Sequence, residues 1–232
     1  MRSVGSVGMM QSPARRLVQR LGQRTPPDLT MDNLPLHPLA ALKAGIQASI
    51  ETKLALLEDR RLLDQIVAVG QLMVQAFQRG NRVLFAGNGG SAADAQHLAA
   101  EFVSRFEFDR PGLPSLSLST DTSMITAIGN DYGYEQLFRR QLQAQARPGD
   151  VFVGITTSGR SKNVLAAFEA CKGLNVTSVA LCGSGGELED KVDMTLRVPS
   201  AHTPRIQECH ILIGHMLCAQ VELAIFGHLK PV

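Results

Sequence analysis

A histidine and a glutamate stand four residues apart, His97 and Glu101, in a segment whose apolar pattern predicts a helix. Side chains at this spacing share one helix face, about 6 Å apart. Such a pair can hold a divalent metal, or it can place a base beside an acid. An ordinary exposed His–Glu pair on a helix surface is the structural alternative.

A second polar group interrupts the last apolar segment, where Gln207, His210 and His215 stand among hydrophobic residues. Burying such groups is costly unless they are paired or ligated. Gln207 and His215 are eight residues apart, which is about 12 Å of axial rise on a helix. To meet at one atom, these two side chains need a bent helix, their full side-chain length, or two subunits.

Two further segments are typical of anion-binding loops. Residues 87–91 read GNGGS, and glycines there let backbone N–H groups approach an anion, while Ser91 and Asp94 predict a capping box at the start of the next helix. Residues 156–161 read TTSGRS and offer four hydroxyl groups before another helix. Without a lysine clamp, this second loop suits a phosphate that anchors a substrate better than one being transferred. A plain turn is the alternative in both places.

The elements that must position these residues follow from the hydrophobic pattern. Short runs that are apolar throughout alternate with helical periodicity, which indicates a parallel sheet buried on both faces. The predicted strands are residues 83–86, 116–118, 151–155, 179–182 and 195–198. The predicted helices are residues 39–57, 62–77, 91–106, 123–128, 161–171, 187–192 and 204–226. The fold class is therefore α/β, a three-layer sandwich with a five-stranded parallel sheet, whose ligands bind beyond the carboxyl ends of the strands.

Residues 1–35, rich in Arg, Gly and Pro, are expected to be a disordered leader or the product of a start site assigned too far upstream. One domain over residues 36–232 is expected to follow. The two helices at the start of this domain cannot both be buried on one small sheet, so we expect them to make subunit contacts.

Composition excludes several classes of protein. The 232 residues carry a net charge of only +2, which argues against a domain that grips nucleic acid through its charge. No stretch approaches about 20 uncharged apolar residues, so a soluble protein without a membrane span is expected. Four cysteines lie in apolar segments without a C-x-x-C pair or a secretory signal, which predicts buried thiols in the cytoplasm.

Four motifs in order resemble the phosphosugar-isomerase (SIS) domain and, within it, the phosphoheptose isomerases. They are AGNGGSAADAQHLAAEF at residues 86–102, AIGNDYG at 127–133, ITTSGRS at 155–161 and RIQECH at 205–210. That family converts sedoheptulose 7-phosphate to D-glycero-D-manno-heptose 7-phosphate by enediol proton transfer. This is the first step of nucleotide-activated heptose biosynthesis, which supplies lipopolysaccharide among other glycoconjugates.

The resemblance implies a homotetramer with intersubunit active sites and one Zn²⁺ per subunit. It implies Glu101 as the base and His215 as the acid. The implied metal ligands are His97, Glu101, Gln207 and His215. The implied substrate contacts are Asn88, Gly89, Gly90, Ser91, Glu101, Asn130, Asp131, Thr156, Thr157, Ser158, Ser161 and Gln207. Arg160 is a departure, since the family commonly has Asn there, and a cation at this position would strengthen anion binding or widen the range of accepted sugars.

The alternative is a non-enzymatic SIS-domain relative that binds the replication initiator DnaA. The motifs R-F-E at residues 105–107, R-P at 110–111 and R-I-Q-E at 205–208 are shared with it. That protein lacks the catalytic pair at the positions of Glu101 and His215. Because both residues are present here, the sequence favours the enzyme.

Overall fold

The computed structural model describes residues 38–231, so the predicted leader, residues 1–35, lies outside the described part. The chain divides into two compact units between Ile46 and Gln47. The described part of the first unit is the beginning of helix α2 (Pro38–Glu58). The rest of α2 and all later elements belong to the second unit.

The centre of the second unit is a sheet of five parallel strands in the order β2-β1-β3-β4-β5. The strands are β1 (Val83–Gly87), β2 (Ser115–Ser117), β3 (Val151–Thr156), β4 (Thr177–Cys182) and β5 (Met194–Arg197). Every residue of β1 and β3 is buried, as expected for central strands covered on both faces. The predicted five-stranded parallel sheet is confirmed.

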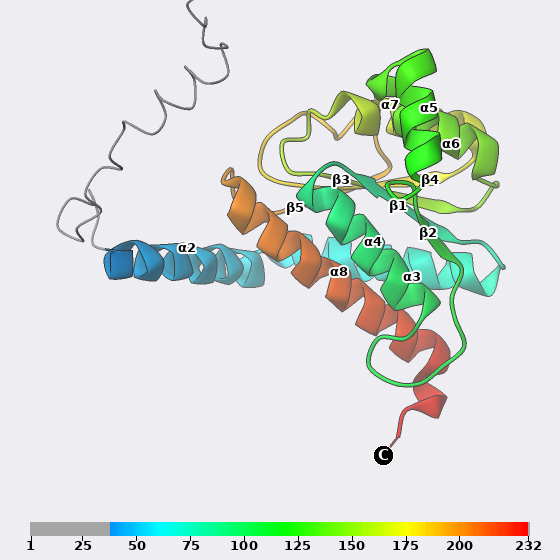
Figure 1. The fold of residues 1–232 in the computed structure, drawn as a ribbon. Coiled ribbons are helices and arrows are strands. Elements are labelled where there is room, and N and C mark those ends of the chain that lie inside the picture. The colour runs from blue at the N-terminus through cyan, green and yellow to red at the C-terminus, as the bar shows by residue number, and fades with distance from the viewer. Residues whose placement is uncertain (1–37, 232) are drawn as a thin grey trace, which may run out of the picture. The chain divides into compact units, whose positions relative to one another are not determined.

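Helices cover both faces of this sheet (Figure 1). One face carries α3 (Arg60–Gln78), α4 (Gly90–Val103) and α8 (Thr203–Phe226). The other carries α5 (Thr122–Tyr132), α6 (Leu137–Gln145) and α7 (Lys162–Leu174). Alternate strand residues enter the two cores: Phe85 packs with the first group, whereas Leu84 and Ala86 pack with the second. A short 3₁₀ turn, η2 (Tyr134–Gln136), joins α5 to α6.

One helix was not predicted from the sequence, and another that was predicted does not form. Helix α6 was not expected, because its apolar residues are few and its packing relies on a short stripe, Leu137, Phe138 and Leu142. The helix predicted over residues 187–192 is absent, and that stretch is an irregular loop with turns. Arg197 holds this connection in place: its guanidinium donates to the carbonyls of Gly183, Gly185 and Gly186 and pairs with Glu189.

Residues Thr203–Leu229 are long and apolar enough, by length and composition alone, to cross a membrane, which corrects the expectation that no stretch qualifies. In the structure this helix is part of the core: Ile206, Ile213 and Val221 are fully or nearly fully buried. The cysteines behave as predicted, since all four are free and buried. Burial raises the pKa of Cys171 and Cys218 to about 12, so their thiols are inert.

A buried ion pair joins the end of α4 to α8. The side chains of Arg110 and Glu222 are each 1% exposed, and Arg110 Nε lies 3.0 Å from Glu222 Oε1. The guanidinium also donates to the carbonyls of Glu101, Phe102 and Ser104 in the last turn of α4. Carbonyls at a helix end lack intrahelical donors, and a cation satisfies them well. The carbonyl of Phe102 also accepts the backbone N–H of Leu113.

The carboxylate of Glu222 in turn accepts the backbone N–H groups of Phe106 and Glu107. Burial acts to raise the pKa of Glu222, but these hydrogen bonds and Arg110 outweigh it, and the pKa lies below its ordinary value. The pair therefore fixes the loop that follows Glu101.

Replacing Arg110 by Met should lower the free energy of unfolding by about 3–5 kcal/mol, because it leaves the buried carboxylate of Glu222 without its cation and removes a hydrogen bond from three carbonyls at the end of α4. Urea unfolding followed by circular dichroism measures this. The matched control is Arg60→Met, which removes an exposed pair with Asp64 and should cost about 0.5 kcal/mol or less. Equal losses in the two variants would show that the buried pair has no special weight.

Candidate active site

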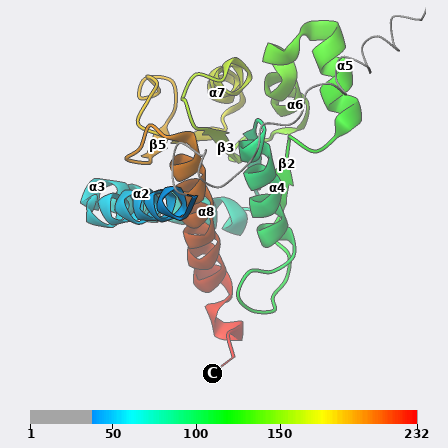
Figure 2. The same cartoon turned by 60° about the vertical axis from the view of Figure 1, so that its left-hand side comes forward.

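The site forms where α4 and α8 lie side by side, as both views of the fold show (Figures 1 and 2). Gly214 makes the close approach possible, since a Cβ there would overlap the side chain of Leu98. The next residue on α8 is His215, and the preceding residue on α4 is His97. The helix contact therefore brings the two histidines together.

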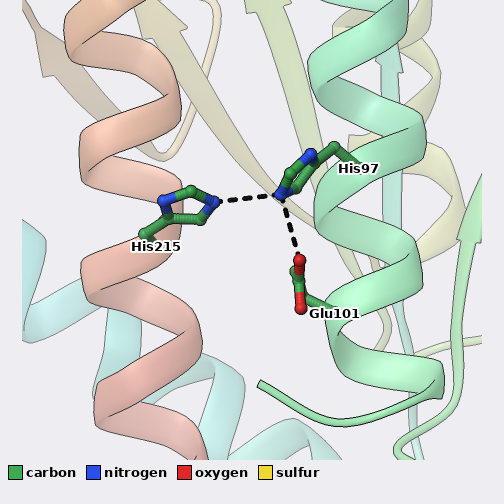
Figure 3. Close-up of side chains that lie close together, drawn as sticks. All are labelled: His97, Glu101 and His215. Atoms are coloured by element: carbon green, nitrogen blue, oxygen red, sulfur yellow. Dashed lines mark hydrogen bonds and ion pairs between the residues drawn. The ribbon is translucent and has the colours of Figure 1, made fainter. Parts of the chain in front are cut away.

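Three predicted residues meet at this point, His97 and Glu101 from α4 and His215 from α8 (Figure 3). His97 Nε2 lies 3.0 Å from Glu101 Oε1 and 3.0 Å from His215 Nε2. One ligand atom from each residue falls within 4.8 Å of the others. The side chain of His97 is 48% exposed and that of Glu101 25%, so substrate and ions have access.

The donor set fits a divalent metal ion. An imidazole nitrogen carries a hydrogen or offers a lone pair, so His97 Nε2 cannot both donate to Glu101 and accept from His215. Three electron-rich atoms facing one point are better satisfied by a cation. Tetrahedral Zn²⁺ with nitrogen ligands at about 2.0–2.1 Å would separate two nitrogens by about 3.3 Å, close to the spacing seen. His97, Glu101 and His215 would hold the ion.

Gln207, the fourth ligand implied by the resemblance, lies elsewhere along the same helix. Its amide contacts Gly90 at the start of α4 so closely that a side chain at Gly90 would overlap it. His97 is seven residues further along α4, about 10 Å of helix rise. The role of Gln207 as a ligand stays a prediction.

The other polar residues of this segment are accounted for in different ways. Glu208 accepts a hydrogen bond from Ser49 of α2 and pairs with Lys53. Both contacts lower the pKa of Glu208, the one from Ser49 most. His210 is fully buried, and its ring nitrogens make no hydrogen bond of normal geometry to the described residues, although the backbone of Cys182 is close enough to oppose the shift in its pKa. Burial lowers the pKa of His210 to about 4, so this imidazole is neutral at pH 7. His210 is therefore a core residue.

The capping box predicted at the start of α4 is wrong. The N-cap is Gly89, with φ of +56°, and it makes no side-chain cap hydrogen bond. Ser91 is instead buried in the first turn at 4% exposure. Asp94 Oδ2 has no hydrogen-bond partner among the described residues, and burial raises the pKa of Asp94 to about 6, with His97 opposing the shift.

The hydroxyl-rich loop runs from the end of β3 to the N-cap of α7, which is Ser161. Thr156 Oγ1 and Ser161 Oγ lie 3.0 Å apart, so two of the four hydroxyls face one another. Gly159 has φ of +65° and packs against the backbone of Gly185, where a Cβ would come within 2.7 Å of the carbonyl oxygen. The loop is thus a tight turn at a helix start, as an anion cradle requires.

The glycine-rich loop after β1 places Asn88 against Asn163, at the start of α7, with both amide-to-amide distances 2.9 Å. Asn130 and Asp131 lie exposed in the last turn of α5, where Asn130 Nδ2 donates to Asp131 Oδ1 at 2.8 Å. Sequence reasoning missed Asn163, although it lies only two residues after the hydroxyl-rich motif.

Phe106 was also missed as a site residue. Its ring centroid lies 5.3 Å from that of His215. Its backbone N–H is held by Glu222, so the buried pair described above fixes both Glu101 and the ring that supports His215. No local motif in the sequence announces this contact.

Comparison with known proteins shows the family of this chain. The profile of the SIS domain matches residues 48–183, more than half of the chain. A phosphoheptose isomerase from Aneurinibacillus thermoaerophilus is 58% identical over 186 residues, covering 80% of this chain and 94% of that protein. This chain belongs to the phosphoheptose isomerases of the SIS-domain family. Phosphoheptose isomerase 2 from Campylobacter jejuni is 56% identical and covers 85% of this chain and 96% of its own length.

Solved phosphoheptose isomerases share the fold. The enzyme from Francisella tularensis is 37% identical with a TM-score of 0.76, covering 80% of this chain and 98% of its own. The enzyme from Neisseria gonorrhoeae is 40% identical with a TM-score of 0.74, covering 79% and 98%. The chain is therefore an isomerase, and none of these comparisons supports the DnaA-binding alternative.

Replacing His97 by Ala should weaken Zn²⁺ binding by more than the roughly 10- to 100-fold that loss of an outer-shell partner costs, because a direct ligand is removed. Calorimetric titration of the chelator-treated protein with Zn²⁺ measures the affinity. His202→Ala is the control, since His202 is exposed at the N-cap of α8 and its side chain caps nothing. Unchanged zinc affinity in the His97 variant would remove the triad as the metal site.

Proposed function

We propose that this isomerase converts sedoheptulose 7-phosphate to D-glycero-D-manno-heptose 7-phosphate, as a zinc-dependent homotetramer in the cytoplasm. The observation that carries the proposal is the convergence of His97, Glu101 and His215 in a chain of this family. Buried free thiols are consistent with a reducing compartment.

The reaction moves a carbonyl from C2 to C1. A proton leaves C1, an enediolate forms, and a proton returns to C2. Glu101 is the base for both transfers, since it is a partly exposed carboxylate at the end of α4. His215 serves the oxygen atoms, because an imidazole nitrogen can donate or accept a hydrogen there. A bound Zn²⁺ would polarise the substrate carbonyl and favour the enediolate.

Glu101 has two oxygens, which removes a conflict between holding a metal and acting as a base. Its Oε1 faces His97 at 3.0 Å. Its Oε2 has no hydrogen-bond partner within the described range 38–231, although the carboxylate is partly open to solvent. One oxygen can therefore bind the ion while the other takes the proton, without the carboxylate detaching.

The phosphate is assigned to the loop of residues 156–161. Hydroxyl and backbone N–H donors at the start of α7 suit an oxyanion that stays intact. Arg160 is exposed in this loop, and its backbone N–H donates to Ser158 Oγ at 3.2 Å. A cation there adds attraction for the dianionic phosphate, in line with a substrate anchored at the end remote from the reacting carbons.

The homotetramer is supported by one face of α2. Six apolar side chains recur there at helical spacing and are 46–66% exposed. They are Leu39, Leu42, Ile46, Ile50, Leu54 and Leu57. A stripe of this kind is typical of helices that pack against copies of themselves.

Glu101→Gln should lower kcat by at least about 100-fold, because the amide nearly keeps the volume but cannot accept the proton. Product formation from sedoheptulose 7-phosphate is followed by NMR, with zinc content measured in parallel. Glu169→Gln, an exposed acid on α7, is the control and should keep full activity. Normal turnover by a zinc-loaded Glu101→Gln protein would refute the assignment of the base.

The double substitution Ile50→Glu and Leu54→Glu should shift the tetramer to smaller species, because it places two charges in the apolar stripe. Light scattering after size-exclusion chromatography measures the mass. Lys43→Glu adds an acid at an exposed polar position of the same helix and should leave the tetramer intact. A tetramer that survives the double substitution would exclude this stripe as the interface.

A further inference from the structure

The side-chain oxygen of Asn88 accepts two hydrogen bonds, which is all that it can accept. Asn88 Oδ1 accepts from Asn163 Nδ2 at 2.9 Å and from the phenol of Tyr134 at 2.8 Å. Asn88 Nδ2 donates one hydrogen to Asn163 Oδ1 at 2.9 Å. An amide oxygen has two lone pairs and an amide nitrogen two hydrogens. The amide of Asn88 therefore has one N–H left to offer and no acceptor.

Asn163 fixes which way this amide points. It is 3% exposed, and its Oδ1 also accepts the backbone N–H of Val164 at 3.0 Å. Because that oxygen faces two donors, Asn163 cannot exchange its amide groups without losing both bonds. Asn163 also lies in the first turn of α7, the helix capped by Ser161, so it joins the glycine-rich loop to the helix that follows the hydroxyl-rich loop.

Tyr134 reaches Asn88 from η2, in a segment whose side chains are at most partly buried. No residue of α5 or η2 is buried. Besides the phenol, Glu135 pairs with Lys162 at 2.8 Å, and both contacts attach η2 to the loops at the carboxyl ends of β1 and β3. The same segment carries Asn130 and Asp131, assigned above to the sugar.

We propose that Tyr134 is a positioning residue for the substrate. Its hydroxyl occupies the second lone pair of Asn88 Oδ1, which leaves Asn88 purely a hydrogen-bond donor, and it ties the α5–η2 segment to the glycine-rich loop. The free N–H of Asn88 then selects an oxygen acceptor on the phosphosugar, a hydroxyl or a phosphate oxygen. The kinetic part of this inference rests on the proposed isomerase reaction, but the contact itself does not.

The chain offers a matched pair of variants, because it has two tyrosines and no tryptophan. Tyr134→Phe removes only the hydroxyl. Tyr132→Phe is the control: Tyr132 lies two residues away, is 54% exposed, and stacks its ring under Arg140 with 3.7 Å from Arg140 Cζ to the ring centroid. Phenylalanine keeps that ring.

Tyr134→Phe should raise KM for sedoheptulose 7-phosphate about 3- to 10-fold and change kcat less than about twofold. The variant loses the hydrogen bond from Tyr134 to Asn88, and the contact of Asn88 with the substrate is expected to be equally strong in the ground state and in the transition state. The melting temperature should not change, since the phenol is exposed. Tyr132→Phe should keep both constants. An unchanged KM in Tyr134→Phe, or the same rise in both variants, would overturn the proposal.

Fluorotyrosine labelling separates this test from the reaction. The ¹⁹F NMR spectrum has one signal for each tyrosine, assigned with the two variants, and is recorded with sedoheptulose 7-phosphate and with inorganic phosphate. The Tyr134 signal should move with the sugar phosphate while the Tyr132 signal stays. If the wild-type protein binds the sugar without turning it over, the proposed function fails and the tyrosine contact stands. If the protein turns over and the Tyr134 signal does not move, the tyrosine contact fails alone.

Discussion

The close approach of α4 and α8 is the constraint on which the site depends. Gly214 has no side chain, and Leu98 fills the space that one would occupy. A larger residue at position 214 would separate the helices, and the two imidazole rings beside this contact would no longer meet. His97 and His215, which are more than 100 positions apart in the chain, meet because residue 214 is a glycine and has no Cβ. The buried Arg110–Glu222 pair fixes the same two helices one to two turns further on.

The two functions of the site are carried by different kinds of structure. The groups assigned to proton transfer stand on long helices packed into a core, where their positions vary little. The groups assigned to the phosphate stand on tight loops at the ends of strands, where backbone N–H groups are available. Asn163 links the two regions, because it bonds Asn88 and lies in the first turn of the helix that follows the hydroxyl-rich loop. Helices hold the reacting groups rigidly, whereas loops can adapt to a flexible sugar.

Much of the fold was predictable because parallel strands buried on both faces leave a strong signal. The apolar run at residues 151–155 has no other plausible environment, and the spacing of His97 and Glu101 sets their common face once a helix is assumed. Contacts that depend on tertiary packing were not predictable. Gly214 resembles any small residue in an apolar helix, and nothing local shows that Leu98 lies opposite it.

The errors have the same origin. The loop of residues 187–192 has helix-forming composition, but Arg197 on the next strand draws its neighbouring carbonyls into an irregular path. Ser91 has the composition of a cap, but the helix begins earlier, at Gly90, and buries it. In both cases a contact from outside the local sequence outweighs a preference that is real but small.

Without a cation, the contacts within the triad of His97, Glu101 and His215 are partly unfavourable. His97 Nε2 faces a second imidazole nitrogen and a carboxylate oxygen at 3.0 Å each, and one hydrogen cannot satisfy both. The 48% exposure of His97 lets water relieve part of this repulsion, which a fully buried triad could not do. A bound cation would relieve the rest, and its binding free energy would then add to the stability of the folded chain. The groups are held in place by Gly214 and Arg110, so their alignment does not wait for the ion, and little of the binding energy is spent on ordering the site.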